Sequence, residues 1–121
     1  MAPVKAPQSQ AKLLVSLFQI PEAYRIKLTN HAEQLKSSGN KKSMNTCILT
    51  ALDEYLSLNI ELQEKPVLPS PPLRAFTVRM TAETKERLTM AAANWQLKTA
   101  LPTSMNAVLN TALRVYLKKH S

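Results

Sequence analysis

The chain has 121 residues, of which 45% are apolar, and it contains a single glycine and a single cysteine. This length suits one ordinary domain or two small units that share a core, and the shortage of glycine argues against a turn-rich β-sandwich. The lone Cys47 excludes an internal disulfide framework and is expected to be a small core residue. The chain shows neither a signal peptide nor an apolar run of roughly 18 residues, which favours a cytoplasmic protein.

The charge is strongly basic. Sixteen Lys and Arg residues against eight Asp and Glu residues give a net charge of +8. Residues 73–121 hold eight of the basic residues and only two of the acidic ones. A basic domain with a pI above about 9 is typical of nucleic-acid binders. The same charge also suits an anionic membrane surface or an acidic protein partner.

The first elements along the chain are an arm, a strand and a helix. Residues 1–11 contain two prolines and no periodicity, which predicts a mobile N-terminal arm. The apolar run 12–20 reads as a strand, although its length also allows a buried helix segment. Pro21 suits the first turn of a helix that ends near Gly39, a plausible left-handed C-cap. The apolar face of this helix is predicted to hold Tyr24, Leu28, Ala32 and Leu35.

A second helix follows, capped by Ser43. Its apolar residues recur with the period of an amphipathic helix that has one buried face. They are Met44, Cys47, Ile48, Ala51, Leu52, Tyr55 and Leu56. Residues 59–72 then contain four prolines and are predicted to form a semi-rigid linker.

After the linker the pattern begins again. Residues 74–80 alternate as a strand, with Phe76, Val78 and Met80 on one face and Ala75, Thr77 and Arg79 on the other. Thr81 can cap a helix whose apolar face includes Trp95, a position that favours core packing over base stacking. Ser104 opens the last helix, whose apolar face is predicted to hold Met105, Val108, Leu109, Ala112, Leu113, Tyr116 and Leu117.

The two halves are therefore copies of one unit. Residues 43–56 and 104–117 are identical at eight of fourteen positions at an offset of 61. Such self-similarity indicates a repeated structural unit. We expect the units 12–58 and 73–121 to form one domain, packed together as the subunits of a symmetric dimer would be.

A lone strand in each unit has no partner within its own unit. Two such strands can pair antiparallel, which predicts a mostly α fold of four helices and a two-stranded antiparallel ribbon. This pattern resembles the ribbon-helix-helix family of DNA-binding proteins, here as a tandem, intramolecular pseudo-dimer. The resemblance is carried by the strand 76–80, the junction 20–22 and the approach to the second helix from Gly39 to Asn45.

The resemblance implies that the outward strand positions contact bases in the major groove of double-stranded DNA. In the second strand these are Ala75, Thr77 and Arg79, and in the first they correspond to Val15, Leu17 and Gln19. Val15 and Leu17 depart from a polar pattern, which leaves three interpretations open. The ribbon reads DNA chiefly through the second strand, the first strand is shifted by one residue, or the apolar face serves a protein partner.

The helix starts are the predicted phosphate contacts, because unpaired N–H groups and the helix dipole favour an anion there. Capping serines are common in every kind of protein, so this prediction depends on the resemblance. The predicted phosphate-contacting residues are Lys41, Lys42, Ser43, Met44, Asn45, Arg74, Thr103, Ser104, Met105 and Asn106.

The resemblance extends to single-chain members that take part in processing and transfer of plasmid border DNA (T-DNA), which implies an accessory role in that process. The alternative is an assembly module of a transfer or repressor complex that binds DNA weakly and without specificity. His31 and His120 have no Cys or acidic cluster around them, and no nucleotide-binding or catalytic motif is present. We therefore expect no metal, no cofactor and no enzymatic activity.

Overall fold

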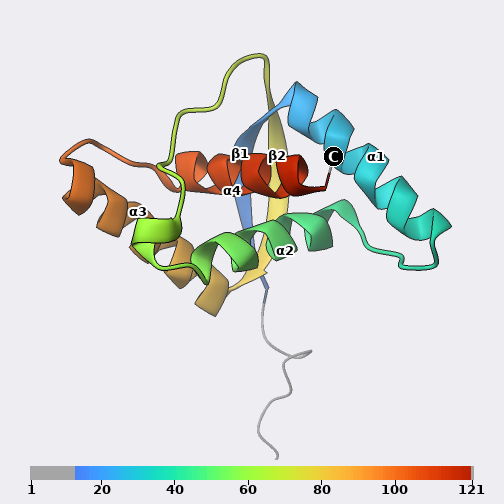
Figure 1. Ribbon diagram of the computed structural model, residues 1–121, viewed down its shortest axis with the longest axis horizontal. Coiled ribbons are helices and arrows are strands. Elements are labelled where there is room, and N and C mark those ends of the chain that lie inside the picture. The colour runs from blue at the N-terminus through green and yellow to red at the C-terminus, as the bar shows by residue number, and fades with distance from the viewer. Residues whose placement is uncertain (1–12, 121) are drawn as a thin grey trace, which may run out of the picture.

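The computed structural model describes residues 13–120, and the predicted arm 1–11 lies outside this range. The described residues form four α-helices, one short 3-10 helix and two strands, shown in Figure 1. In chain order they are β1 Leu13–Pro21, α1 Glu22–Ser37, α2 Met44–Leu56, η2 Ile60–Leu62, β2 Leu73–Thr81, α3 Ala82–Thr99 and α4 Met105–Lys119. The fold is thus two strand–helix–helix units in tandem, mostly helical as the repeat predicts.

The two strands pair antiparallel into the only sheet of the described residues. Leu17 lies opposite Thr77 at the centre of the ribbon. Four inward side chains, two from each strand, are almost fully buried; they are Phe18, Ile20, Val78 and Met80. Residues 13–21 are therefore a strand rather than a helix segment. Its register is the unshifted one, with Val15 and Gln19 facing outward.

The pairing gives the ribbon a pseudo-twofold axis. An offset of 60 relates the first strand to the second, so Leu17 corresponds to Thr77, the residue it faces. The same offset relates Gln19 to Arg79. These two residues lie on different strands and on opposite sides of the central Leu17–Thr77 pair. This is the strand arrangement of a symmetric dimer, reproduced within one chain.

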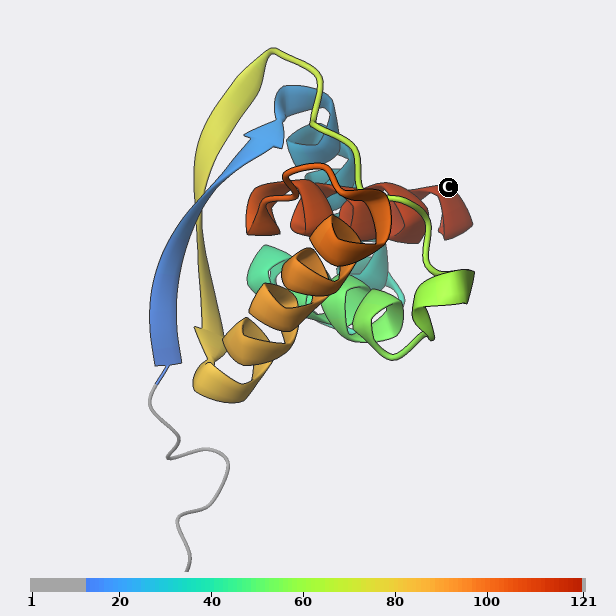
Figure 2. The same cartoon turned by 90° about the vertical axis from the view of Figure 1, so that its left-hand side faces the viewer.

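All four α-helices lie on one side of the ribbon, as Figure 2 shows. The predicted apolar faces of α2 and α4 are buried or half-buried in a core that includes both strands. Cys47 is fully buried, as expected of a small core residue. Trp95 is buried too, and its indole N–H donates to Gln63 Oε1 at 2.8 Å. No helix among residues 13–120 is long and apolar enough to cross a membrane.

The helix ends largely follow the predicted capping. Ser43 Oγ accepts the Thr46 N–H, and Ser104 Oγ accepts the Ala107 N–H. Gly39 adopts a left-handed φ of 84°, just past the end of α1. Pro21 differs slightly from the prediction, because it ends β1 and occupies the N-cap position one residue before the helix.

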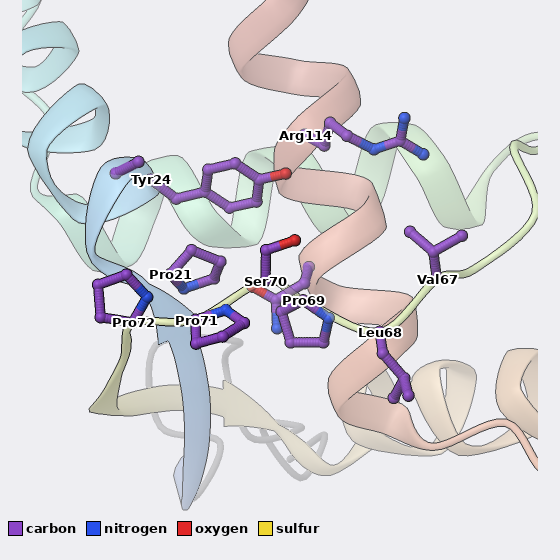
Figure 3. A pocket seen from close by; sticks show the side chains of 11 residues that line it. Pro21, Tyr24, Val67, Leu68, Pro69, Ser70, Pro71, Pro72 and Arg114 are labelled. Atoms are coloured by element: carbon purple, nitrogen blue, oxygen red, sulfur yellow. The ribbon is translucent and has the colours of Figure 1, made fainter.

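The proline-rich linker runs across the helices and is held near its middle and at its C-terminal end. The Val67 N–H donates to Thr111 Oγ1 at 3.1 Å, and the Glu22 N–H donates to the Pro72 carbonyl at 2.9 Å. Its C-terminal part lines a pocket beside Tyr24 and Arg114, shown in Figure 3. The linker therefore closes one end of the ribbon instead of hanging free between the units.

A cluster of polar rings lies where α1 meets the end of α4. His31 Nε2 is 2.9 Å from the Tyr116 hydroxyl, and the His120 ring lies 5.0 Å from the His31 ring between centroids. Burial lowers the pKa of His31, and the charges of His120 and Lys42 lower it further. Burial also raises the pKa of Tyr116 to about 12. Both shifts favour the neutral forms of the His31 ring and the Tyr116 hydroxyl.

This cluster predicts a loss of stability in mild acid. Because the pKa of His31 is lower in the folded than in the unfolded chain, the unfolded chain binds more protons as the pH falls through about 6.5. The free energy of unfolding should therefore decrease from about pH 7.5 to pH 5.5. In urea titrations, His31→Gln should reduce this decrease. His120→Gln should retain most of it, because burial is the main cause. An unchanged pH dependence in His31→Gln would contradict the assignment.

Candidate nucleic-acid interface

The outward face of the ribbon is uncovered within the described residues (Figure 2). Ala75, Thr77 and Arg79 of β2 are exposed there, as are Leu17 and Gln19 of β1. The sequence-predicted base-contacting residues are thus brought together on one surface. The Arg79 guanidinium has no hydrogen bond or ion pair within residues 13–120, so its donors are available to a ligand.

Two asparagines hold the edges of the ribbon. Asn45 Oδ1 accepts the Arg79 N–H at 2.9 Å, and Asn45 Nδ2 donates to the Arg79 carbonyl at 3.1 Å. Asn106 makes the same pair of bonds with Gln19, at 2.8 and 3.1 Å. A carboxamide offers one acceptor and donors side by side, so it mimics a neighbouring strand. We call these two pairs of bonds the asparagine clamps.

The clamps cross between the units. Asn45 belongs to the first unit and binds the second strand, whereas Asn106 belongs to the second unit and binds the first strand. The clamps therefore place the start of α2 beside Arg79 and the start of α4 beside Gln19, both of which are predicted base-contacting residues. The sequence predicted Asn45 and Asn106 as phosphate contacts. The structure shows their side chains engaged with the strands, which leaves only their backbone N–H groups for that role.

The starts of α2 and α4 keep donors available for an anion. The first N–H groups of a helix have no partner inside the helix. Ser43 and Ser104 each satisfy the third one, which leaves the N–H groups of residues 44, 45, 105 and 106 as the predicted donors. Thr103 is half-buried and its hydroxyl donates to the Leu101 carbonyl, so its side chain serves the loop.

A cation that the sequence analysis missed lies at one of these starts. Lys85 Nζ donates to Ser16 Oγ at 3.1 Å. Lys85 also lines an open groove with residues 15–18 of β1 and residues 104–106 at the start of α4. The internal repeat could have indicated Lys85, because it is the counterpart of Arg25 at the offset of 60. Both units therefore carry a basic residue at this equivalent position.

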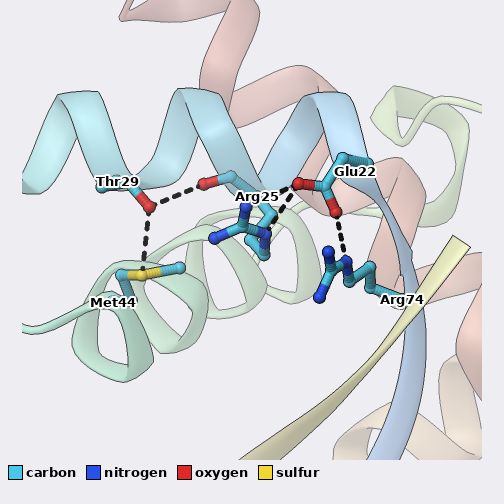
Figure 4. A network of polar contacts seen from close by, with 5 residues as sticks. All are labelled: Glu22, Arg25, Thr29, Met44 and Arg74. Atoms are coloured by element: carbon cyan, nitrogen blue, oxygen red, sulfur yellow. Dashed lines mark hydrogen bonds and ion pairs between the residues drawn. The ribbon is translucent and has the colours of Figure 1, made fainter.

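The counterpart in the first unit is arranged differently, as Figure 4 shows. Arg25 Nε donates to Glu22 Oε2 at 3.0 Å, and Arg74 Nε lies 2.7 Å from Glu22 Oε1. The hydrogen bond from Arg25 is the main cause that lowers the pKa of Glu22. Arg74, a predicted phosphate contact, is thus paired with a carboxylate. The second unit has Ala82 in place of Glu22, so Lys85 meets no such carboxylate.

Lys41 and Lys42 approach the start of α2 from the preceding loop. Lys41 is exposed, whereas Lys42 is half-buried and its charge reaches His31 and Cys47. Apart from Arg74, the predicted phosphate contacts therefore fall into two groups, one at the start of α2 and one at the start of α4, with different cations. No group of three or more His, Cys, Asp and Glu side chains that could hold a metal ion occurs in the described part of the chain.

The chain was compared with protein-family models, with curated proteins and with solved structures, and none of the three comparisons gave a match. The tandem strand–helix–helix units and their antiparallel strand pairing are consistent with a ribbon-helix-helix arrangement.

The asparagine clamps predict a specific effect on stability. Asn45→Ala removes two hydrogen bonds that each contribute about 1 kcal/mol, so it should lower the free energy of unfolding by about 1–2 kcal/mol. Asn45→Asp should lower it at least as much at neutral pH, because a carboxylate has no donor for the Arg79 carbonyl and repels it. Urea unfolding measures both.

Thr46→Ala is a suitable control, because it changes the same exposed first turn without touching the strand. If Asn45→Asp were as stable as the parent protein, the clamp would have no energetic role.

Proposed function

We propose that this protein binds double-stranded DNA by inserting its ribbon into the major groove. The observation that carries the proposal is the joint arrangement of the uncovered ribbon face and the two clamped helix starts. Strands lie roughly 4.8 Å apart, so a two-stranded ribbon with its side chains fits a groove about 12 Å wide. The helix starts on either side then face the phosphates that border the groove.

The chemistry of the uncovered face supports base contact. Arg79 can donate two hydrogen bonds to the O6 and N7 atoms of guanine, and Gln19 can bind the N6 and N7 atoms of adenine. The clamps fix the backbone of both residues, so little backbone entropy would be lost on binding. Thr77 and Ala75 complete the set of base-contacting residues in this proposal.

Phosphate contact would come from the helix starts and their cations. On the first unit these are Lys41 and Lys42 with Ser43, and on the second Lys85 with Ser104. A charge of +8 favours approach to any duplex, whereas base contacts decide among sequences.

The finer role follows from resemblance alone. The chain resembles the second protein of the virC operon of tumour-inducing plasmids, which is implicated in binding DNA beside the T-DNA border. We therefore propose an accessory role in processing and transfer of plasmid border DNA in the bacterial cytoplasm. Other proteins of such a transfer complex are the partners that this role implies.

One observation favours a second candidate function. Leu13, Val15 and Leu17 are exposed aliphatic residues on the same face of β1. A surface of this kind also suits an assembly module that contacts another protein and binds DNA only through charge. Binding to duplexes of varied sequence at about 150 mM salt separates the two functions, because purely electrostatic binding weakens strongly with salt.

The first test of DNA binding is Arg79→Ala. Because Asn45 binds only the backbone of Arg79, the substitution leaves the clamp in place. Loss of a bidentate contact should weaken binding to the preferred duplex by about 1–3 kcal/mol and reduce the preference for guanine. Fluorescence anisotropy with a panel of duplexes measures both effects.

Arg87→Ala is the charge-matched control, since Arg87 pairs with Asp53 on the helical side of the molecule. Equal affinity and equal preference in the Arg79 and Arg87 variants would rule out the ribbon as the reading element.

The second test concerns phosphate contact. Lys85→Met and Lys41→Met should each weaken binding to all duplexes alike and reduce the slope of log K against log salt by about 1. Lys98→Met, near the C-terminal end of α3, should leave the slope unchanged. A salt slope that responds equally to all three substitutions would show only the effect of net charge.

A further inference from the structure

The outward face of β1 carries an unbroken aliphatic strip. Its first three outward residues, Leu13, Val15 and Leu17, are 51%, 63% and 65% exposed. The alternate residues Phe18 and Ile20 are buried, so the register leaves no doubt about which face the strip occupies. Exposed aliphatic residues usually occur singly on a protein surface. Three in a row on one strand face need a partner.

The surroundings of the strip point to its partner. Val15 lies opposite Arg79 across the ribbon, and Lys85 with the start of α4 lines the groove beside residues 15–18. An apolar strip that lies between a base-contacting residue, Arg79, and a phosphate-contacting group, Lys85 with the start of α4, matches a major groove, where thymine methyl groups lie among the base edges beside the phosphates. A second copy of this ribbon would instead bring like charges together.

The spacing of the strip agrees with this partner. Outward side chains of a strand recur about every 6.7 Å. Two base-pair steps advance about 6.8 Å along the axis of the DNA helix. The three residues of the strip can therefore lie over bases two steps apart.

We propose that Leu13, Val15 and Leu17 contact the 5-methyl groups of thymines in the major groove, so that this half of the ribbon selects thymine. The inference rests on the proposed function and adds the chemical group that the first strand recognises. The first strand then reads methyl groups through apolar contact, whereas Arg79 of the second strand reads guanine through hydrogen bonds.

The test uses two duplexes of about 20 base pairs with alternating adenine and thymine, in which thymines on each strand are two steps apart. In the second duplex every thymine is replaced by deoxyuridine, which lacks only the methyl group. Removal of one buried methyl group should weaken binding about fourfold. The unmodified full chain should therefore bind the deoxyuridine duplex at least about fourfold more weakly.

The matched variants separate contact from duplex shape. The double variant Val15→Ser with Leu17→Ser keeps only Leu13 of the strip, so it should lose most of the preference for the thymine duplex. The control variant Leu62→Ser with Leu97→Ser changes two exposed leucines away from the ribbon and should keep the full preference. Circular dichroism verifies that each variant is folded.

Each other outcome overturns the inference. If the parent protein binds both duplexes equally, the proposed DNA binding stands and thymine recognition fails. If the double serine variant keeps the full preference, the preference comes from duplex shape. If no duplex binds, the proposed function fails as well. If the serine substitutions abolish self-association in sedimentation experiments and leave the preference unchanged, the strip is a protein contact.

Discussion

The asparagine clamps and the ribbon depend on each other, and the rest of the interface depends on both. A two-stranded ribbon has two open edges, and its N–H and carbonyl groups need partners there. Asn45 and Asn106 supply such partners at Arg79 and Gln19 from the helix starts of the opposite unit. Neither unit can therefore complete its own strand. The two halves fold as one structure because each supplies the hydrogen-bond partners that the strand of the other needs.

The core imposes the same requirement. The inward side chains of the two strands lie between the same helices, and α2 and α4 pack against each other at the centre. Separating the units would expose both apolar helix faces and both strand edges together. The stability of the ribbon and that of the helical core are thus coupled.

The periodicity and the internal repeat were sufficient to predict the four α-helices, the two strands, the strand pairing and the serine caps, whereas the short helix η2 lies in the predicted linker and was not expected. They succeeded because an amphipathic helix and an alternating strand leave local patterns, and because the offset of 60 or 61 reveals equivalent positions. The hydrogen-bond partners of the polar side chains could not be predicted from the sequence. Asn45 meets a residue 34 positions away and Asn106 one 87 positions away. The pairing of Arg74 with Glu22 and the position of Lys85 beside β1 are likewise products of the tertiary fold.

The central pair of the ribbon has one further consequence. In a dimer of identical chains, the two residues on the twofold axis must be the same. Here they are Leu17 and Thr77, which can differ because one chain carries both units and the two sequences need not be identical. The two ends of the ribbon are therefore chemically different. In the proposed complex with DNA, the two orientations of the molecule along a duplex would therefore differ, and such a molecule could mark polarity on a substrate whose two ends are to be treated differently.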